Sequence, residues 1–165
     1  MEIKAIRGMN DILPEDVSKW RFVEETARRI FALYGFEELR TPILERTELF
    51  LRGIGDDTDV VEKQMYTFTD KGGESVSLRP EATASVLRAV IEHGLLTEDP
   101  IRKLCSIGPM FRYERPQKGR YRQFHQINAE RLGEEGPFSD AETLQLAYVL
   151  ATSLGLKNVT MEVNS

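Results

Sequence analysis

The sequence predicts an α+β fold in which an antiparallel β-sheet is flanked by helices. Strand-like runs joined by short turns alternate with amphipathic helical patterns, and the sequence lacks both a Gly-rich phosphate loop and the strand order of a parallel nucleotide-binding sheet. With 165 residues, of which 41% are hydrophobic and 30% charged, the chain is long enough to bury one core. We therefore expect one domain, residues 1–165, without an internal boundary.

A long amphipathic helix followed by an edge strand is expected first. Pro14 suits the first turn of a helix over residues 14–34, and Gly35 suits the position after the last turn. Residues 36–44 predict a strand that enters a proline-marked bend, and Pro42 excludes this strand from a sheet centre. This pair favours a subunit interface, although an ordinary surface helix with an edge strand fits equally well. The apolar stripe of the helix comprises Val17, Trp20, Val23, Ala27, Ile30, Phe31 and Tyr34.

A short hairpin and a second helix are expected next. Strands at 65–69 and 75–78 flank the turn at residues 70–73, which has the sequence Asp-Lys-Gly-Gly. Arg79 and Pro80 then open a helix that ends at Gly94. The face expected to be apolar comprises Thr83, Val86, Leu87, Val90 and Ile91.

The second half predicts a longer hairpin, a third helix and a last strand. Strands at 102–114 and 121–132 are joined by a basic turn, and residues 159–163 predict the final strand. Ser139 and Glu142 form a capping-box pattern at the start of the helix. The helix is expected to be lined by Ala141, Leu144, Ala147, Tyr148, Ala151 and Leu154.

Composition excludes several classes of protein. No run reaches the ~18 apolar residues of a membrane span, and the first residues lack a signal-peptide core, so we expect a cytoplasmic protein. Cys105 is the single cysteine, which excludes an internal disulfide and indicates a small buried side chain. His93 and His125 lie at no familiar zinc spacing from it, so we expect no protein-built metal site.

Positive charge is focused on one short segment. The net charge of −5 argues against a general nucleic-acid-coating protein, but residues 112–122 hold five basic residues and one acid, a local charge of +4. Such a loop is suited to polyphosphate, although a basic turn is often only solvent-exposed.

The strand after this loop carries an unusual set of side chains on one face. Alternation places Arg122, Phe124, Gln126, Asn128 and Glu130 together on that face. A cation, an aromatic ring, amides and a carboxylate suit a nucleotide and a small polar ligand. The alternative is the solvated side of an antiparallel sheet, which is common.

Four segments carry a resemblance to a known family. Residues 108–126, GPMFRYERPQKGRYRQFHQ, are similar over nineteen positions to the second motif of class II aminoacyl-tRNA synthetases in its histidyl form. Residues 7–11, 59–63 and 78–83 agree with it, and the helix and strand ending at Pro42 resemble the first motif. The resemblance spans essentially the whole chain and implies a class II catalytic-domain fold.

The resemblance implies roles for individual residues. Arg112, the catalytic residue, would grip the α-phosphate of ATP, which is bound with Mg²⁺. Glu114 and Phe124 would hold the adenine, and Arg120 and Arg122 would lie near the outer phosphates. The site for histidine would comprise Glu81, Thr83, Arg112, Gln126 and Glu130. Glu81 and Thr83 also fit an ordinary helix start, because a carboxylate is favourable there.

The implied function is that of a histidine–tRNA ligase. It forms histidyl-adenylate and transfers histidine to tRNA(His), as a homodimer joined through residues 17–43. The third motif and the anticodon-binding domain would follow Ser165, so we expect a truncated domain with weak or no activity by itself. The alternatives are a dimerisation module and a non-catalytic relative, the histidine-sensing regulatory subunit of ATP phosphoribosyltransferase.

Overall fold

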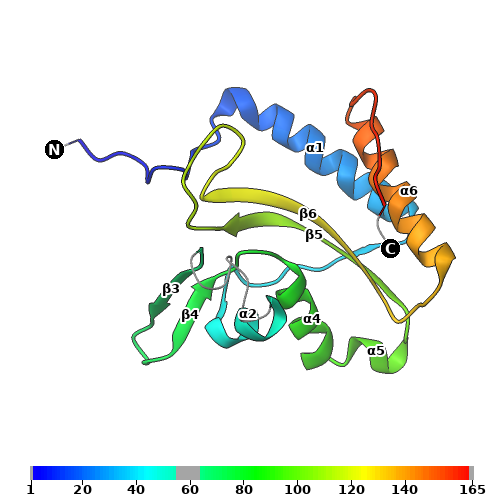
Figure 1. Cartoon of the computed structure of the whole chain (residues 1–165), viewed down its shortest axis with the longest axis horizontal. Coiled ribbons are helices and arrows are strands. Elements are labelled where there is room, and N and C mark those ends of the chain that lie inside the picture. Colours follow the sequence, from blue (N-terminus) through cyan, green and yellow to red (C-terminus); the bar gives the residue numbers. More distant parts are fainter. Residues whose placement is uncertain (1, 55–63, 164–165) are drawn as a thin grey trace. The chain divides into compact units, whose positions relative to one another are not determined.

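A computed structural model of the chain describes residues 2–54 and 64–163 (Figure 1). No helix in these ranges is long and apolar enough to span a membrane. The helices are α1 (Pro14–Leu33), α2 (Thr47–Ile54), α4 (Thr83–Glu92), α5 (Leu95–Glu98) and α6 (Pro137–Ser153). The strands are β1 (Glu37–Glu38), β2 (Leu44–Arg46), β3 (Tyr66–Thr69), β4 (Ser75–Leu78), β5 (Arg102–Phe111) and β6 (Gln123–Leu132).

The strands form two three-stranded sheets, in the orders β1-β5-β6 and β2-β4-β3. The α+β class is confirmed, with one exception to the antiparallel expectation, because β1 pairs with β5 in parallel. The contacts divide the chain into two compact units. The first contains residues 1–12, 39–94 and 106–128, and the second contains residues 13–38, 95–105 and 129–165.

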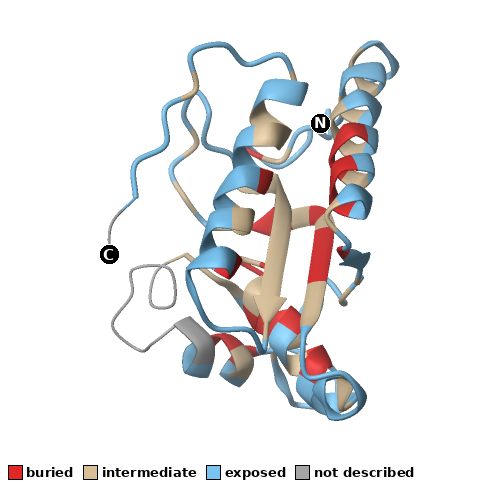
Figure 2. Ribbon diagram, turned by 90° about the vertical axis from the view of Figure 1, so that its right-hand side faces the viewer, coloured by how far each residue is buried: buried red, intermediate tan, exposed pale blue. Residues whose placement is uncertain are grey.

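In the second unit, α1 buries the stripe that its sequence predicts. Ala27, Ile30 and Phe31 are almost fully buried, and the other positions of the stripe are half-buried (Figure 2). Phe36, just after the helix, packs against Phe31 with ring centroids 5.7 Å apart. Cys105 on β5 is buried as expected, and burial raises the pKa of its thiol to about 11.

The start and the buried face of α6 differ from the prediction. The helix begins at Pro137, and its first residues form no capping box. The Glu142 carboxylate instead pairs with Lys103 and Arg131, and the hydrogen bond from Lys103 leads the causes that lower its pKa. Ser139 and Leu146 are buried, while Ala141, Leu144, Ala147 and Tyr148 are exposed. Apolar residues surround this helix on nearly every side, so their spacing does not single out one face.

Two strand predictions differ from the structure, the first in its extent and the second altogether. The run expected at 36–44 is divided into β1 and β2, which belong to different sheets, because the segment around Pro42 leaves the first sheet before the second begins. Residues 159–163 form no strand, since neither of the described sheets pairs with them.

In the first unit, the short hairpin of β3 and β4 is confirmed. Thr69 pairs with Ser75 at its end, and β2 pairs with the other edge of β4. The Ser77 hydroxyl is completely buried and hydrogen-bonds to the Thr47 and Thr67 hydroxyls, at 3.0 and 2.7 Å. Thr47 begins α2, a helix that the sequence reasoning missed.

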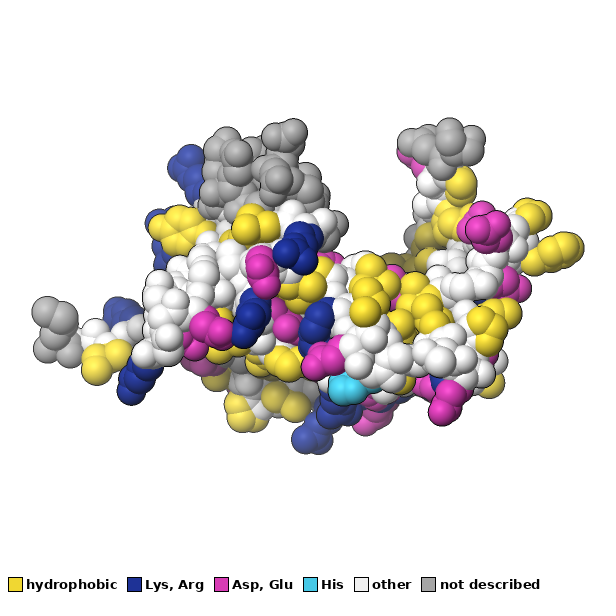
Figure 3. Space-filling view, turned by 90° about the horizontal axis from the view of Figure 1, so that it is seen from below, with side chains coloured by type: hydrophobic (Ala, Val, Ile, Leu, Met, Phe, Trp, Pro, Cys, Tyr) yellow, Lys and Arg dark blue, Asp and Glu magenta, His cyan; other side chains and the backbone are white. Residues whose placement is uncertain are grey.

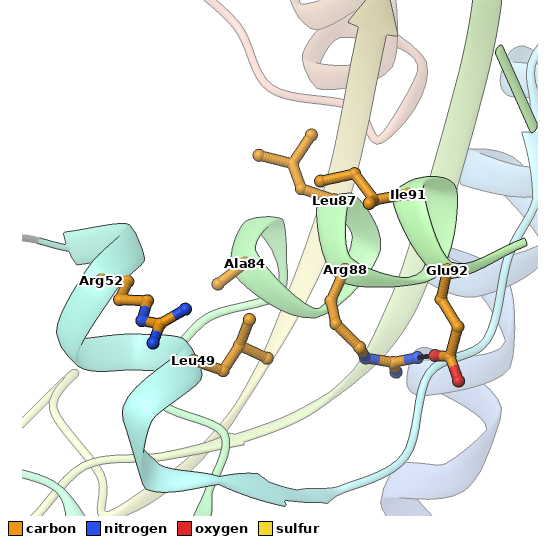
Figure 4. A pocket seen from close by; sticks show the side chains of 7 residues that line it. All are labelled: Leu49, Arg52, Ala84, Leu87, Arg88, Ile91 and Glu92. Atoms are coloured by element: carbon orange, nitrogen blue, oxygen red, sulfur yellow. Dashed lines mark hydrogen bonds and ion pairs between the residues drawn. The ribbon is translucent and has the colours of Figure 1, made fainter. Parts of the chain in front are cut away.

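Helix α4 begins at Thr83, three residues after the predicted start at Pro80. Val86 and Val90 are buried as expected, but Leu87 and Ile91 are 38% and 80% exposed. They line an open groove of about 470 Å³ with Leu49 of α2, beside the ion pair between Arg88 and Glu92 (Figure 4). In the space-filling view, basic and acidic side chains lie side by side, in keeping with such pairs (Figure 3).

Candidate active site

The basic loop, residues 112–122, connects β5 to β6 and borders a cavity of about 410 Å³. Four of the residues that the resemblance assigns to ATP line this cavity: Arg112, Glu114, Arg120 and Phe124. Gly119, Tyr121 and His125 complete its wall. These three residues were not predicted as ligand-binding residues, although Gly119 and Tyr121 lie in the basic loop.

Arg112 is held in place by contacts at both ends of the residue. Its main-chain N–H donates to the Arg122 carbonyl at 2.9 Å, which continues the pairing of the two strands into the loop. The side-chain Nε donates to the Pro80 carbonyl at 2.9 Å, and the guanidinium carbon lies 5.2 Å from the centre of the Phe124 ring. Because Nε is occupied, the two terminal nitrogens of the guanidinium are the groups oriented for an anion.

Glu114 and Arg120 form an ion pair across the loop. The Arg120 Nη1 lies 3.7 Å from the Glu114 carboxylate, whose side chain is 18% exposed while that of Arg120 is 67% exposed. Gln117 and Arg120 pair through two main-chain hydrogen bonds, of 3.1 and 2.9 Å, which close the tip of the loop. The exposed cation can therefore change partner at a small cost, while the carboxylate stays in the wall.

The Arg122 side chain supports the loop. Its guanidinium lies over the Tyr113 ring, 4.2 Å from the ring centre, and its Nε donates to the Glu114 carbonyl at 3.1 Å. Tyr113 in turn packs edge-on against Tyr66. Arg122 therefore lies behind Glu114. Glu114, Tyr121 and Phe124 form the cavity wall next to it, and Arg122 is not among the described residues that line the cavity.

Apart from Arg112, the residues expected to bind histidine lie in three places. Glu81 caps α4, because its two carboxylate oxygens accept the main-chain N–H groups of Thr83 and Ala84, at 2.5 and 2.9 Å. Gln126, on β6 two residues beyond Phe124, has a buried side-chain oxygen without a hydrogen-bond partner in the described part of the chain. Glu130 lies further along β6, in the second compact unit.

Burial of the Arg79 guanidinium was not predicted from the sequence. Arg79 is 6% exposed and donates to the carbonyls of Thr41 and Pro109, at 2.9 and 3.0 Å, and to the Thr41 hydroxyl at 3.0 Å. Burial lowers its pKa. Gly108 provides the space, since a Cβ there would lie 2.6 Å from a terminal nitrogen of Arg79. Arg79 thus joins the Thr41 segment to β5, one residue before the Pro80 carbonyl that orients Arg112.

One segment that carries the resemblance, residues 59–63, lies outside the described residues. Residues 7–11 are described, and they contact the basic loop. The Gly8 carbonyl accepts hydrogen bonds from the main-chain N–H groups of Arg122 and Gln123.

Comparisons with known proteins show the family of the chain. The histidyl-tRNA synthetase family profile matches residues 8–165. The chain is 58% identical to the histidine--tRNA ligase of Pelobacter propionicus over 165 residues, which cover 100% of this chain and 40% of that protein. It is also 58% identical to the Geobacter sulfurreducens ligase over 163 residues, covering 99% and 40%. The chain thus spans about two-fifths of the length of these relatives.

Solved structures show the same fold. The apo histidyl-tRNA synthetase of Staphylococcus aureus matches with a TM-score of 0.79 and 44% identity, over 94% of this chain and 36% of that one. A Bacillus halodurans protein, described as an ATP phosphoribosyltransferase regulatory subunit/histidyl-tRNA synthetase, has the same TM-score at 22% identity, covering 94% and 39%. This second likeness shows the fold alone. Given the profile match over nearly every residue, the chain belongs to the histidyl-tRNA synthetase family.

Proposed function

We propose that the cavity bordered by the basic loop binds ATP as its magnesium complex, and that the chain supplies the ATP-binding part of a histidine–tRNA ligase. The observation that carries this proposal is the placement of Arg112. Its guanidinium is fixed by Pro80, lies over Phe124 and opens on the same cavity as Glu114 and Arg120.

Each residue in the wall has a role that its chemistry supports. Arg112 contacts the α-phosphate, the Phe124 ring stacks on the adenine, and the Glu114 carboxylate accepts from the exocyclic amine. Arg120 moves from Glu114 to the outer phosphates, at little cost because it is exposed. Arg122 would reach a phosphate only by leaving Tyr113, so we assign it mainly to shaping the loop.

Histidine binds next to ATP in this proposal. The unpartnered oxygen of Gln126 supports a polar ligand here, because a buried acceptor without a donor costs about 1–3 kcal/mol until a ligand supplies one. The Glu81 carboxylate keeps lone pairs for the α-amino group after accepting two main-chain N–H groups. Thr83 completes the part of the proposed site that lies in the first unit, and Arg112 also serves the histidine carboxylate; the role of Glu130 stays a prediction from the resemblance.

The proposed reaction is activation of histidine. A carboxylate oxygen of histidine attacks the α-phosphorus of ATP, a new oxygen–phosphorus bond forms, and the bond to pyrophosphate breaks. Arg112 stabilises the charge that grows on the α-phosphate, a kind of contact worth about 10²- to 10³-fold in rate. The ribose hydroxyl at the end of tRNA(His) then takes the histidyl group and releases AMP.

We further propose that the protein works as a two-fold dimer through residues 17–43, in the cytoplasm. The exposed side chains of Phe22 and Leu33 on α1, at 54% and 75% exposure, support a partner on this helix. The free thiol of Cys105 suits a reducing compartment. Light scattering that finds only monomers at high micromolar concentration would count against the dimer.

A histidine-sensing regulatory subunit is the second candidate, because a protein described as such a subunit has the same fold, although the fold does not distinguish it from the ligase. A sensor has no need to hold ATP phosphates, so the Arg112 arrangement favours the ligase. Separate calorimetric titrations of the chain with Mg·ATP and with histidine distinguish them. We expect ATP to bind with one site per chain. Histidine binding together with no ATP binding would support the sensor and overturn the ligase proposal.

A further inference from the structure

Residues 6–9 form a tight turn whose role the proposed function leaves open. The Met9 N–H donates to the Ile6 carbonyl at 2.8 Å, and Gly8 has a φ of +86°, which L side chains rarely adopt. We call these four residues the Gly8 turn. It belongs to the same compact unit as the basic loop.

The Gly8 carbonyl holds the point at which the basic loop returns to the sheet. It accepts the main-chain N–H of Arg122 at 2.7 Å and that of Gln123 at 3.1 Å. Arg122 is also the residue whose carbonyl accepts the Arg112 N–H. The turn therefore acts on the residue that pairs with Arg112, and it does so with main-chain groups alone.

The turn also lies against both sides of the loop. A Cβ on Gly8 would lie 2.9 Å from Pro116 Cγ, on the outgoing side, and 3.1 Å from Arg122 Cγ, on the returning side. Any side chain at this position would push one of them away. Glycine is thus required twice, once for the backbone conformation and once for the space.

We propose that the Gly8 turn is a positioning element that holds the basic loop in its ATP-binding shape. In this proposal Gly8 touches no ligand; it acts by fixing Arg122 and Pro116, and thereby the loop residues Glu114 and Arg120. The inference rests on the proposed function for its ligand, ATP, but the structural coupling between the turn and the loop is testable without any ligand.

The first measurement uses the unmodified chain. The N–H protons of Arg122 and Gln123 should exchange slowly with deuterium, although they lie at the end of an exposed loop, because Gly8 accepts both. Free exchange of these two protons would overturn the proposal, whether or not any variant folds.

The second measurement compares Gly8→Ala with Gly73→Ala. The control has almost the same φ, +87°, but an added Cβ there meets nothing within 4 Å, so it isolates backbone strain from contact with the loop. Gly8→Ala should raise the exchange rates of the Arg122 and Gln123 N–H protons by about tenfold. It should also weaken Mg·ATP binding by about tenfold, because losing one hydrogen bond or more has an effect of this size. Gly73→Ala should change neither. Equal effects of the two substitutions on exchange at Arg122 and Gln123 would overturn the proposal.

A rescue variant adds a test of mechanism. Pro116→Ala removes the Cγ atom that a Cβ on residue 8 would approach most closely. In the Gly8→Ala background it should recover part of the lost protection at Arg122 and Gln123, and no recovery would show that the contact with Pro116 is not the cause. If the unmodified chain bound no ATP, the proposed function would fail, while exchange at these two protons would still decide the role of the turn.

Discussion

The two hairpins of this chain are stabilised in opposite ways. In the short hairpin, the turn between β3 and β4 is closed by its own residues: the Asp70 carboxylate accepts the N–H groups of Gly72 and Glu74, at 2.8 and 2.9 Å. The Asp70 N–H donates to the Glu74 carbonyl, and the Gly73 N–H to the Asp70 carbonyl. All of these bonds lie within five residues.

The basic loop of the long hairpin depends on distant segments. Gly8 accepts from Arg122, Pro80 accepts from the Arg112 side chain, and the Gln64 carbonyl accepts the Tyr113 N–H at 2.6 Å. A turn that closes on itself keeps its shape but offers few free groups. A loop held from outside can keep its charged side chains for a ligand, and this difference separates a structural hairpin from the one that is proposed to bind ATP.

The largest effect is expected where the long hairpin is anchored. Arg79→Met removes the donors for the carbonyls of Thr41 and Pro109 in a buried place, which should lower the free energy of unfolding by about 2–4 kcal/mol. Urea unfolding measures it. The matched control is Arg46→Met, since the Arg46 side chain is 65% exposed and its ion pair with Glu74 should contribute less than about 1 kcal/mol. Equal losses for the two variants would contradict the anchoring role.

A second large effect concerns binding rather than stability. Arg112→Ala should weaken Mg·ATP binding by about tenfold to a hundredfold, because a fixed charge–phosphate contact is lost. Calorimetry measures this, with Arg46→Ala on β2, the strand beside the short hairpin, as control. Any pyrophosphate exchange by the chain should fall in parallel. If Arg112→Ala changed neither the ATP affinity nor the rate of pyrophosphate exchange, Arg112 would not be the residue that contacts the α-phosphate.

A smaller effect is expected in the short hairpin. Asp70→Ala removes two local hydrogen bonds and should cost about 1 kcal/mol of unfolding free energy, with ATP affinity unchanged. Thermal unfolding with and without Mg·ATP measures both quantities. Weaker ATP binding by this variant would contradict the proposal that only the long hairpin binds the nucleotide.

The same contrast explains what the sequence could predict. Asp-Lys-Gly-Gly between two strand runs predicts its own turn, and the spacing of Ala27, Ile30 and Phe31 predicts the buried face of α1, because both signals are local. Strand alternation and the resemblance together pointed to Arg112, Glu114, Arg120 and Phe124, which line one cavity.

The features that sequence reasoning missed depend on residues far apart in the chain. The Gly8 carbonyl and the buried Arg79 have partners 30 or more positions away, and no local pattern indicates such partners. Glu142 matches a capping box in the sequence, but in the structure its carboxylate pairs with Lys103 and Arg131 instead of capping the helix. The strand expected at residues 159–163 has the right residue types but no neighbouring strand to pair with.

The smallest effect concerns β5, the strand that leads into the basic loop. Burial raises the pKa of Cys105 from the ordinary 9.0 to about 11, with Glu38 adding to the shift. Between these values the unfolded chain loses the thiol proton while the folded chain keeps it, so stability should fall as pH rises from 9 to 11. Below pH 9 the thiol is protonated in both the folded and the unfolded chain, so it does not make the free energy of unfolding depend on pH. Urea unfolding of the chain and of Cys105→Ala across this range gives the difference, and identical slopes would contradict burial of the thiol.

Deuterium exchange with and without saturating Mg·ATP distinguishes the two hairpins, because we propose that the basic loop binds the nucleotide and the short hairpin does not. We expect slower exchange across residues 112–124 and no change across residues 69–75, which remain closed by Asp70 in either state. Equal protection of both hairpins, or saturation by ATP with no change in residues 112–124, would contradict this proposal.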